Sequence, residues 1–308
     1  MKIAAVLTCH NRKDKTISCL ECIYNALDYY NQDGETLIDL TAFITDDGCT
    51  DGTVEAIYSK FSGRKIRIIK GDGQLFWAGG MRLAWGEAVK VGYNYDFYLL
   101  LNDDTIVYKN CFKELLKTND YSLKKYKREG LYSGITCSLD DLKEITYGGS
   151  IWTSRLLAKS KLLEPSGEPQ LCDMANANIL LVSKDVVNEI GILYKGYRHA
   201  EADYDYSINA RKKKFPVLVT SSVCGKCNDD HGSREDNGRK ICAMSFRERI
   251  SFFRNPLHSN GDYLLFIRRN APLRYPIVFV GRCLNIVSPH IYYRFLKKVV
   301  FLYLLCII

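Results

Sequence analysis

The chain has 308 residues, enough for one large domain or for one domain with a smaller appendage, and either would bury a core. Hydrophobic residues make up 47% and charged residues 25%, the composition of a folded globular protein, which sets aside a disordered chain. The net charge of +8 suits an anionic partner, but charge alone does not choose among a nucleotide, a nucleic acid and an acidic membrane surface.

The first hundred residues alternate short apolar runs with helix-like segments. A loop is expected over Gly71–Gly80, because the segment is rich in glycine. Alternation of this kind predicts βαβ units, hence an α/β fold with a mixed, mainly parallel sheet flanked by helices. The expected strands are Ile3–Thr8, Thr41–Thr45, Lys65–Lys70 and Phe97–Leu101, and the expected helices are 15–30, Val54–Phe61 and Met81–Gly92.

Unusual polar loops follow these strands. They are Cys9–Arg12, Asp46–Gly52, Gly71–Gly80 and Asn102–Thr105. Ligands of parallel sheets bind beyond the carboxyl ends of the strands. Four polar loops at one edge therefore predict a single binding site there.

The middle of the chain mixes both kinds of element. Loops are expected at 148–150 and 164–169, because glycine, proline and serine gather there. The expected elements are the strands Ile179–Val182 and Val217–Ser221 and the helices Lys184–Ile190 and Asp203–Lys213.

The C-terminal part, from about Ser233, is basic and aromatic. It ends in Val299–Ile308, which carries no charge and is too short for a transmembrane helix of about twenty residues. We expect this end to lie in a membrane interface, with packing on the domain or on a second subunit as the alternative. The chain is divided on this basis into a catalytic domain, 1–235, and a helical C-terminal region, 236–308.

The twelve cysteines are scattered through apolar stretches, and the N-terminus does not resemble a signal peptide. Reduced thiols and a cytoplasmic protein are therefore expected. Together with the basic, apolar end of the chain, this favours a peripheral position at the inner face of the cell membrane.

The triplet Asn102-Asp103-Asp104 follows an apolar strand and carries the strongest chemical signal. Adjacent carboxylates repel, so a structure that crowds them usually needs a cation, and hard oxygen ligands suit Mn²⁺ or Mg²⁺. Such a metal neutralises the charge that grows on a departing nucleoside diphosphate. An Asx-rich turn after a strand is the plain structural alternative.

Three motifs in order resemble the family 2 glycosyltransferases. They are the run Val6–Arg12, the run Thr45–Thr53 with its Asp-Asp-Gly-Cys-Thr-Asp pattern, and Leu101–Asp104. The resemblance covers about residues 3 to 235. It implies a GT-A fold and an inverting sugar transfer from a nucleotide-sugar donor.

The resemblance also implies roles for individual residues around the nucleotide. Asp47, or less readily Asp46, would hydrogen-bond the base, and Thr8, Asn11 and Arg12 would line the pocket. The loop containing Gly73 and Trp77 would close over the donor, and Phe76–Gly80 is similar to rhamnosyltransferase-like members. Trp77 as a core residue remains as good an interpretation as Trp77 stacking on a sugar.

By the same resemblance, Asp104 would be the metal ligand and Asp103 would lie nearer the sugar or ribose. Asn102 departs from the acidic residue usual there and could accept from a ribose or coordinate weakly. Cys49 likewise stands where serine is usual. His231, in the polar run 228–233, would complete the coordination of the metal.

An inverting transfer needs a general base to take the proton of the acceptor hydroxyl. The segment His199–Arg211 resembles the family's acidic helix start, and Asp203 takes the place of the base. Glu201 is the alternative, because Ala202 replaces the customary glutamate and leaves the register open.

The sequence thus predicts an inverting, metal-dependent glycosyltransferase that uses dTDP-rhamnose or a UDP-sugar. Its acceptor would be a hydroxyl of a saccharide or lipid-linked molecule in surface polysaccharide synthesis. No nucleic acid is expected as a partner, and a homo-oligomer stays open. The alternatives are a sugar-nucleotide nucleotidyltransferase and a non-catalytic sugar- or membrane-binding module with a degenerate pocket.

Overall fold

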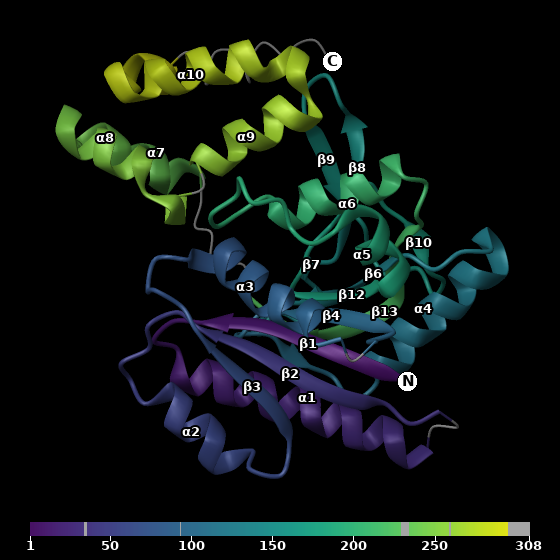
Figure 1. Ribbon diagram of the computed structural model, residues 1–308. Coiled ribbons are helices and arrows are strands. Elements are labelled where there is room, and N and C mark those ends of the chain that lie inside the picture. The colour runs from purple at the N-terminus through teal and green to yellow at the C-terminus, as the bar shows by residue number, and fades with distance from the viewer. Residues whose placement is uncertain (34–35, 93, 229–233, 259, 295–308) are drawn as a thin grey trace.

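The fold is seen in a computed structural model that describes residues 1–33, 36–92, 94–228, 234–258 and 260–294 (Figure 1). Its strands are β1 (Lys2–Cys9), β2 (Asp39–Asp46), β3 (Lys65–Lys70), β4 (Phe97–Leu101), β5 (Ile106–Val107), β6 (Leu131–Cys137), β7 (Ile145–Tyr147), β8 (Gly149–Ser154), β9 (Lys159–Leu162), β10 (Gln170–Leu171), β11 (Met174–Ala175), β12 (Ile179–Ser183) and β13 (Val217–Lys226). Its helices are α1 (Lys13–Asp33), α2 (Thr53–Lys60), α3 (Phe76–Lys90), α4 (Cys111–Tyr126), α5 (Lys184–Ile190), α6 (Ala202–Lys212), α7 (Arg234–Ala243), α8 (Phe246–Arg254), α9 (Asn260–Asn270) and α10 (Tyr275–Val287), with the 3₁₀ turns η1 (Pro256–His258) and η2 (Pro272–Arg274).

A ten-stranded mixed sheet forms the centre of the molecule. Its strand order is β10-β13-β6-β12-β4-β1-β2-β3, with β5 paired to β13 and β7 paired to β6. Strands β3, β2, β1 and β4 are parallel, and β12 runs antiparallel between β4 and β6. A smaller sheet holds β11, β8 and β9. The α/β fold with a mixed, mainly parallel sheet is thus confirmed.

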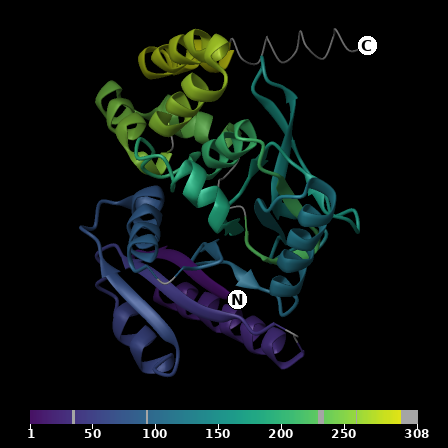
Figure 2. The ribbon, with the colours of Figure 1, turned by 45° about the vertical axis from the view of Figure 1, so that its right-hand side comes forward.

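Helices cover both faces of the large sheet, because its central strands are apolar on both faces. Along β1, Ile3 and Leu7 face a core shared with α1, α2 and α4. Ala4 and Val6 face the opposite core, which is shared with α3, α5 and α6. Alternate side chains of a strand point to opposite faces, so this pattern places β1 in the middle of three layers. Figures 1 and 2 show α1 and α2 on one side of the sheet and α3 and α6 on the other.

The C-terminal helices α8, α9 and α10 form a layer of their own beyond α6, on the side away from α1 and α2 (Figures 1 and 2). Within this layer α10 contacts α8 and α9, and α9 contacts α6. The expected apolar segment Val299–Ile308 lies outside the described residues. In the described part of the chain, no helix combines the length and apolar character that crossing a membrane requires.

The glycine-rich stretch Gly71–Gly80 is not a loop throughout, as expected, because α3 begins at Phe76. Close packing explains the glycines: a Cβ on Gly80 would lie 2.0 Å from Thr8 Oγ1, so only glycine lets the helix approach β1. The expected loop at 148–150 is also wrong, since Gly149 opens β8. Helix α4 and strand β6 were not predicted.

Candidate active site at the carboxyl ends of β1, β2 and β4

Asp47 organises the loop that precedes α3. Its side chain is buried, and its two carboxylate oxygens accept backbone N–H groups from Gly73 (2.8 Å), Leu75 (3.0 Å) and Phe76 (3.1 Å). Gly73 adopts a φ of 81°, which suits glycine. A buried carboxylate with three amide donors is chiefly a structural anchor. Asp47 therefore fixes the position of the loop over the strand ends.

Asn11 and Asp46 join the neighbouring loops. Asn11 Oδ1 accepts the backbone N–H of Thr50 (2.7 Å), and its own N–H donates to Cys49 Sγ (3.3 Å). Asp46 Oδ1 accepts the N–H of Cys49 (2.8 Å) and is only half-buried. Cysteine in place of serine is accommodated here as an acceptor for Asn11. The loops after β1 and β2 thus form one rigid unit.

Thr8 lies at the end of β1 against Gly80 of α3. Thr45, the corresponding residue of β2, donates its hydroxyl to the Gly80 carbonyl at 2.8 Å. Both threonines therefore help to seat the N-terminal half of α3 on the sheet. Thr8 is half-buried at this junction, beside the edge where the polar loops gather.

Trp77 and Asn102 are joined by a hydrogen bond. The Trp77 indole Nε1 donates to Asn102 Oδ1 at 2.7 Å, while the indole packs against the core beneath α3. The ring of Trp77 therefore packs partly on the core, while its N–H contacts the triplet. An amide oxygen at Asn102 accepts this bond without adding a third negative charge beside Asp103 and Asp104.

Arg12 bridges the two aspartates of the triplet. Its guanidinium lies 3.0 Å from Asp103 Oδ1 and forms a second ion pair with Asp104 Oδ2. Burial raises the pKa of Asp103 to about 6, while Arg12 acts in the opposite direction. Asp103 also accepts the Thr16 hydroxyl of α1 at 3.3 Å. Arg12 thus partly neutralises a pair of carboxylates that would otherwise repel.

A hollow of about 360 Å³ opens beside Asp104. Asp104 is the more exposed carboxylate of the triplet, with 18% of its side chain accessible against 6% for Asp103. Over the described residues no group of three His, Cys, Asp or Glu converges as a complete metal site would require. His231, the expected second ligand, lies outside the described residues. Of the two expected ligands, the described residues therefore include only Asp104, whose carboxylate is paired with Arg12.

Asp203 reaches the same region from α6. Its Oδ2 accepts the N–H of Ala177 at 3.0 Å, and the carbonyl of the next residue, Asn178, accepts the N–H of Asn102 at 3.2 Å. The short segment 177–178 therefore connects the predicted base with the acidic triplet, although they lie about a hundred positions apart. Burial raises the pKa of Asp203 to about 6. A carboxylate of this pKa is ionised at neutral pH and is still basic enough to take a proton.

Glu201, the alternative base, sits directly before α6. Burial, and then the neighbouring Asp203 and Asp262, raise the pKa of Glu201 to about 8. The residue has a φ of 64°, in the left-handed region that costs a side chain about 1–3 kcal/mol. At neutral pH Glu201 is therefore mainly protonated and is better suited to donate a hydrogen bond than to accept a proton.

Helix α9 holds the loop that leads into this acidic motif. The buried carboxylate of Asp262 accepts the backbone N–H groups of His199 (2.7 Å), Ala200 (2.9 Å) and Arg198 (3.2 Å). Nearer the end of α9, Arg269 Nε pairs with the buried Asp205 Oδ1 at 2.9 Å. Both contacts come from the C-terminal layer. Helix α9 therefore fixes the motif 201–203 from both of its sides.

The loop 198–200 also contacts the start of α3. The Arg198 carbonyl accepts the N–H of Ala78 at 3.1 Å, and the Arg198 guanidinium lies 4.9 Å from the centre of the Phe76 ring. His199 stands edge-on to the same ring, with centroids 6.4 Å apart. The loop held by Asp47 and the loop held by Asp262 thus meet at Phe76. Sequence reasoning missed Asp262 and Arg269, because neither stands in a motif and their partners lie 60 or more positions away.

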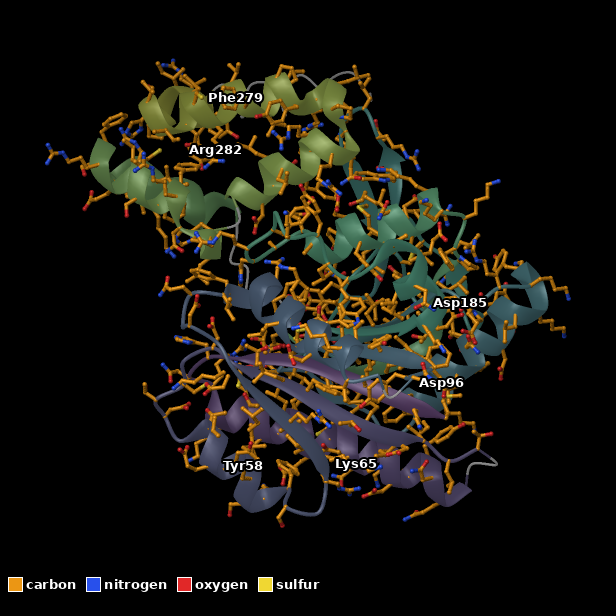
Figure 3. The ribbon with its side chains drawn as sticks, viewed as in Figure 1. Tyr58, Lys65, Asp96, Asp185, Phe279 and Arg282 are labelled. Carbon is orange, nitrogen blue, oxygen red and sulfur yellow. The ribbon has the colours of Figure 1, made fainter. Side chains whose placement is uncertain are left out.

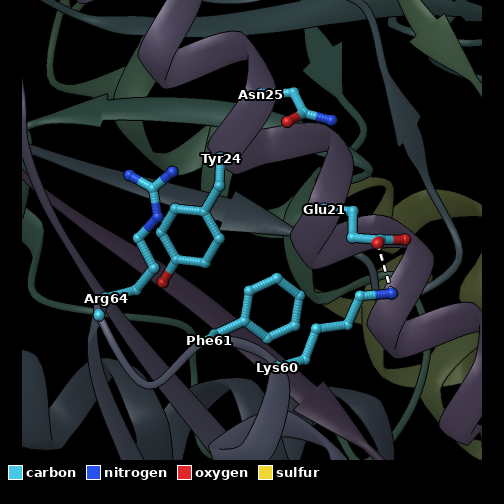
Figure 4. Close-up of a pocket in the computed structure, with 7 residues that line it drawn as sticks. Glu21, Tyr24, Asn25, Lys60, Phe61 and Arg64 are labelled. Atoms are coloured by element: carbon cyan, nitrogen blue, oxygen red, sulfur yellow. Dashed lines mark ion pairs between the residues drawn. The ribbon is translucent and has the colours of Figure 1, made fainter.

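A second hollow, of about 320 Å³, lies between α1 and α2 and does not belong to this site (Figure 4). Tyr24 and Phe61 pack within it with ring centroids 5.5 Å apart, and Arg64 covers Tyr24 at 4.8 Å. An ion pair between Lys60 and Glu21 closes one end. The aromatic packing and the ion pair account for its residues as a joint between two helices.

Two glycosyltransferases are among the solved structures with a similar fold. The mannosyltransferase PcManGT from Pyrobaculum calidifontis, in complex with GDP-Man and Mn²⁺, has a TM-score of 0.52 and 10% identity over 98% of this chain and 80% of its own. S. aureus TarS 1–349 with UDP-GlcNAc has a TM-score of 0.53 and 10% identity over 93% of this chain and 80% of its own. The UDP complex of TarS gives 0.53, with 94% and 81% covered at 10% identity. No family model and no curated protein sequence matches the chain. At such identity the likeness establishes a shared fold.

Proposed function

We propose that this protein is an inverting glycosyltransferase that moves a sugar from a nucleoside diphosphate donor to an acceptor hydroxyl. One observation carries the proposal: the carboxylate of Asp203 and the triplet Asn102–Asp104 are held at the two ends of the segment 177–178. A base and a diphosphate-facing acidic cluster side by side are what direct displacement at an anomeric carbon requires. The folds of PcManGT and TarS support the proposal.

In this proposal the donor lies across the ends of β1, β2 and β4. Asp46 accepts a hydrogen bond from the nucleotide base, because its side chain is half-buried and accepts one backbone N–H through Oδ1. Both carboxylate oxygens of Asp47 already accept backbone N–H groups. Thr8 and Asn11 shape the pocket floor, and Gly73 brings the loop backbone close to the nucleotide. Trp77, held by Asn102, borders the sugar.

Asp104 is the proposed ligand of a Mn²⁺ or Mg²⁺ ion, with His231 as a second ligand. When bound, the cation would neutralise the charge of the leaving diphosphate. Arg12 contacts both aspartates and supplies a positive charge at the same place. Asp103, which is held by Arg12 and by Thr16, is the proposed partner of a ribose or sugar hydroxyl.

Asp203 is the proposed base, which takes the proton of the acceptor hydroxyl as that oxygen attacks the anomeric carbon from the face opposite the diphosphate. The bond from the anomeric carbon to the diphosphate oxygen breaks, so the anomeric configuration inverts. For the donor we propose dTDP-rhamnose or a UDP-sugar. For the acceptor we propose a saccharide or lipid-linked molecule of surface polysaccharide synthesis, at a membrane surface.

A panel of nucleotide-sugars tests the reaction class. The protein is incubated with each donor, with Mn²⁺ or with a chelator, and the released nucleotide is identified by chromatography. We expect a nucleoside diphosphate, more rapidly with Mn²⁺, and a variant Asp203→Asn that binds the donor but does not transfer. Release of pyrophosphate would show a nucleotidyltransferase, and binding without turnover of any donor would show a non-catalytic module.

A further inference from the structure

Helix α10 directs its charged side chain toward the protein and exposes apolar side chains, the opposite of a usual surface helix. Its one charged residue, Arg282, points inward, where Nη2 donates to the Phe253 carbonyl at 2.8 Å and the guanidinium lies 5.8 Å from the Phe253 ring centre. Asn285 is buried as well, at 7% exposure. Figure 3 shows Arg282 directed between α10 and α8, away from the outer side of α10. The polar side chains of this helix thus face the protein.

The outer face of α10 is apolar. Ile277 is 74% exposed, Val280 is 64% exposed and Val287 is 66% exposed. Leu273 of the preceding turn is 81% exposed. With Pro276, Phe279 and Cys283, which are also exposed, the apolar face of α10 spans an arc of about 160° at 100° per residue. That arc is broader than the narrow seam of a coiled coil.

The positive charge of the protein is concentrated in the same part of the chain. Residues 1–235 hold 31 Lys and Arg against 32 Asp and Glu, whereas residues 236–308 hold 12 against 3. Arg254, Arg268 and Arg294 are exposed in the described part of that region. Residues 236–308 therefore carry a net charge of +9 (12 − 3), against −1 (31 − 32) for the rest of the chain, and they include the apolar face of α10.

We propose that the outer face of α10 docks on the surface of an anionic lipid bilayer. An apolar face in the acyl boundary with basic residues at the headgroups is the arrangement of interfacial helices. A second copy is a poorer occupant, because two such basic layers would repel each other. The apolar face of α10 lies far from α2, since Phe279 and Tyr58 are at opposite ends of the molecule in Figure 3. Docking through α10 therefore leaves α2 free of the membrane.

Vesicle flotation of the full chain tests the proposal, and it measures binding without any donor or transfer. The probe is a vesicle of equal parts phosphatidylglycerol and phosphatidylcholine, compared with phosphatidylcholine alone. We expect the protein to float with the anionic vesicle and less so as salt rises. The double variant Ile277→Asp/Val280→Asp should bind at least roughly tenfold more weakly than the parent, because it places charge on the apolar face. Tyr58→Asp, which places one acidic side chain at an exposed position of α2, should bind as the parent does.

Four outcomes would overturn the proposal. The first two are that the protein does not float with the anionic vesicle, or that the double variant floats as well as the parent. The third is that Leu302→Asp/Leu304→Asp abolishes binding while the double variant still binds. The fourth is that the parent forms a dimer without lipid and the double variant is a monomer. Light scattering reports the last of these. Thermal unfolding at the parent temperature shows that the double variant is folded, and the salt response of the unchanged protein tests the charge component separately. Failure here leaves the proposed transfer reaction standing.

Discussion

Glu201 and Asp203 differ by the hydrogen bonds that their carboxylates receive. Asp203 accepts the N–H groups of Ala177 and Tyr204, which favour its ionised form and partly offset the effect of burial on its pKa. For Glu201, burial and the negative charges of Asp203 and Asp262 all raise the pKa. With pKa values of about 6 and about 8, the first group is a base at neutral pH and the second is an acid.

Substitution of each carboxylate by its amide should separate the two roles. If Asp203 is the base, as proposed, Asp203→Asn should lower kcat roughly 100- to 10,000-fold, whereas Glu201→Gln imitates the protonated form and should cost far less. In the parent, activity should rise with pH through about 6, because Asp203 must lose its proton. Steady-state kinetics between pH 5 and 8 measure this. Glu201→Gln should keep that acidic limb, and its disappearance would exchange the two assignments.

The motifs placed polar residues in loops but did not reveal what their side chains contact. Asn11 and Asp47 stand in the predicted loops, but their polar atoms bind backbone groups of neighbouring loops. A one-dimensional pattern does not distinguish a residue that meets a ligand from one that holds the loop in place. The link from Ala177 to Asp203 was equally invisible, because a backbone N–H has no residue type to recognise.

Helix α3 depends on glycine where it crosses β1. A Cβ on Gly80 would collide with Thr8 Oγ1 at 2.0 Å, whereas a Cβ on Gly86 would meet only Ile192 Cδ1, at 4.0 Å. Gly80→Ala should therefore lower the free energy of unfolding by about 1–3 kcal/mol through overpacking. Gly86→Ala, in the same helix, should raise it by up to about 1 kcal/mol. Urea unfolding measures both. Equal effects would contradict the steric account.

Helix α9 connects the C-terminal layer, through Asp262, to the segment that carries the proposed base. Asp262→Asn keeps the shape of the side chain but weakens its grip on the N–H groups of His199 and Ala200. We expect kcat to fall roughly tenfold with the donor KM unchanged, because the loop before Glu201 loses its alignment while the nucleotide pocket stays intact.

The matched control for this contact is Asp96→Asn. Asp96, labelled in Figure 3, accepts the backbone N–H of Lys2 at 2.7 Å. It directly precedes β4, whereas the acidic triplet follows the other end of that strand. It should change stability modestly and kcat little. A parallel fall of kcat in both variants would show that Asp262 contributes only general stability.

Strands and helices were predicted correctly where the apolar residues follow a clear periodicity. They were missed where contacts with distant residues determine the local structure. The strands at 3–8, 65–70 and 97–101 and the helix at 184–190 agree with the structure, since each is a compact apolar or amphipathic run. The start of α3 was missed because its glycines suggest a loop, and they are needed for contact with Thr8. Asp262 was missed because its partners are 62–64 positions away.

At the scale of the whole molecule, the site joins two parts of one sheet. The parallel strands β1, β2 and β4 present the proposed donor loops, while antiparallel β12 follows the segment that contacts Asp203. Asp262 of the C-terminal layer accepts the N–H of Ala200 and so holds the loop that precedes the proposed base. A bound donor would therefore touch loops from several elements, and its binding energy would add to the stability of the entire fold.

Thermal unfolding with nucleoside diphosphates tests this linkage. At about a hundredfold excess over Kd, a ligand of the folded state adds about 2.7 kcal/mol, which should raise Tm by roughly 5 °C in a chain of this size. UDP, dTDP and GDP with Mn²⁺ are compared with the nucleotide plus a chelator, and we expect the larger shift with the metal. In Asp104→Asn the metal-dependent part should vanish, because the proposed protein ligand is lost, while a smaller nucleotide shift persists through the loops of β1 and β2. An unchanged metal response in Asp104→Asn would mean that the cation is held elsewhere, and that the Arg12 pair rather than a metal is the natural partner of this carboxylate.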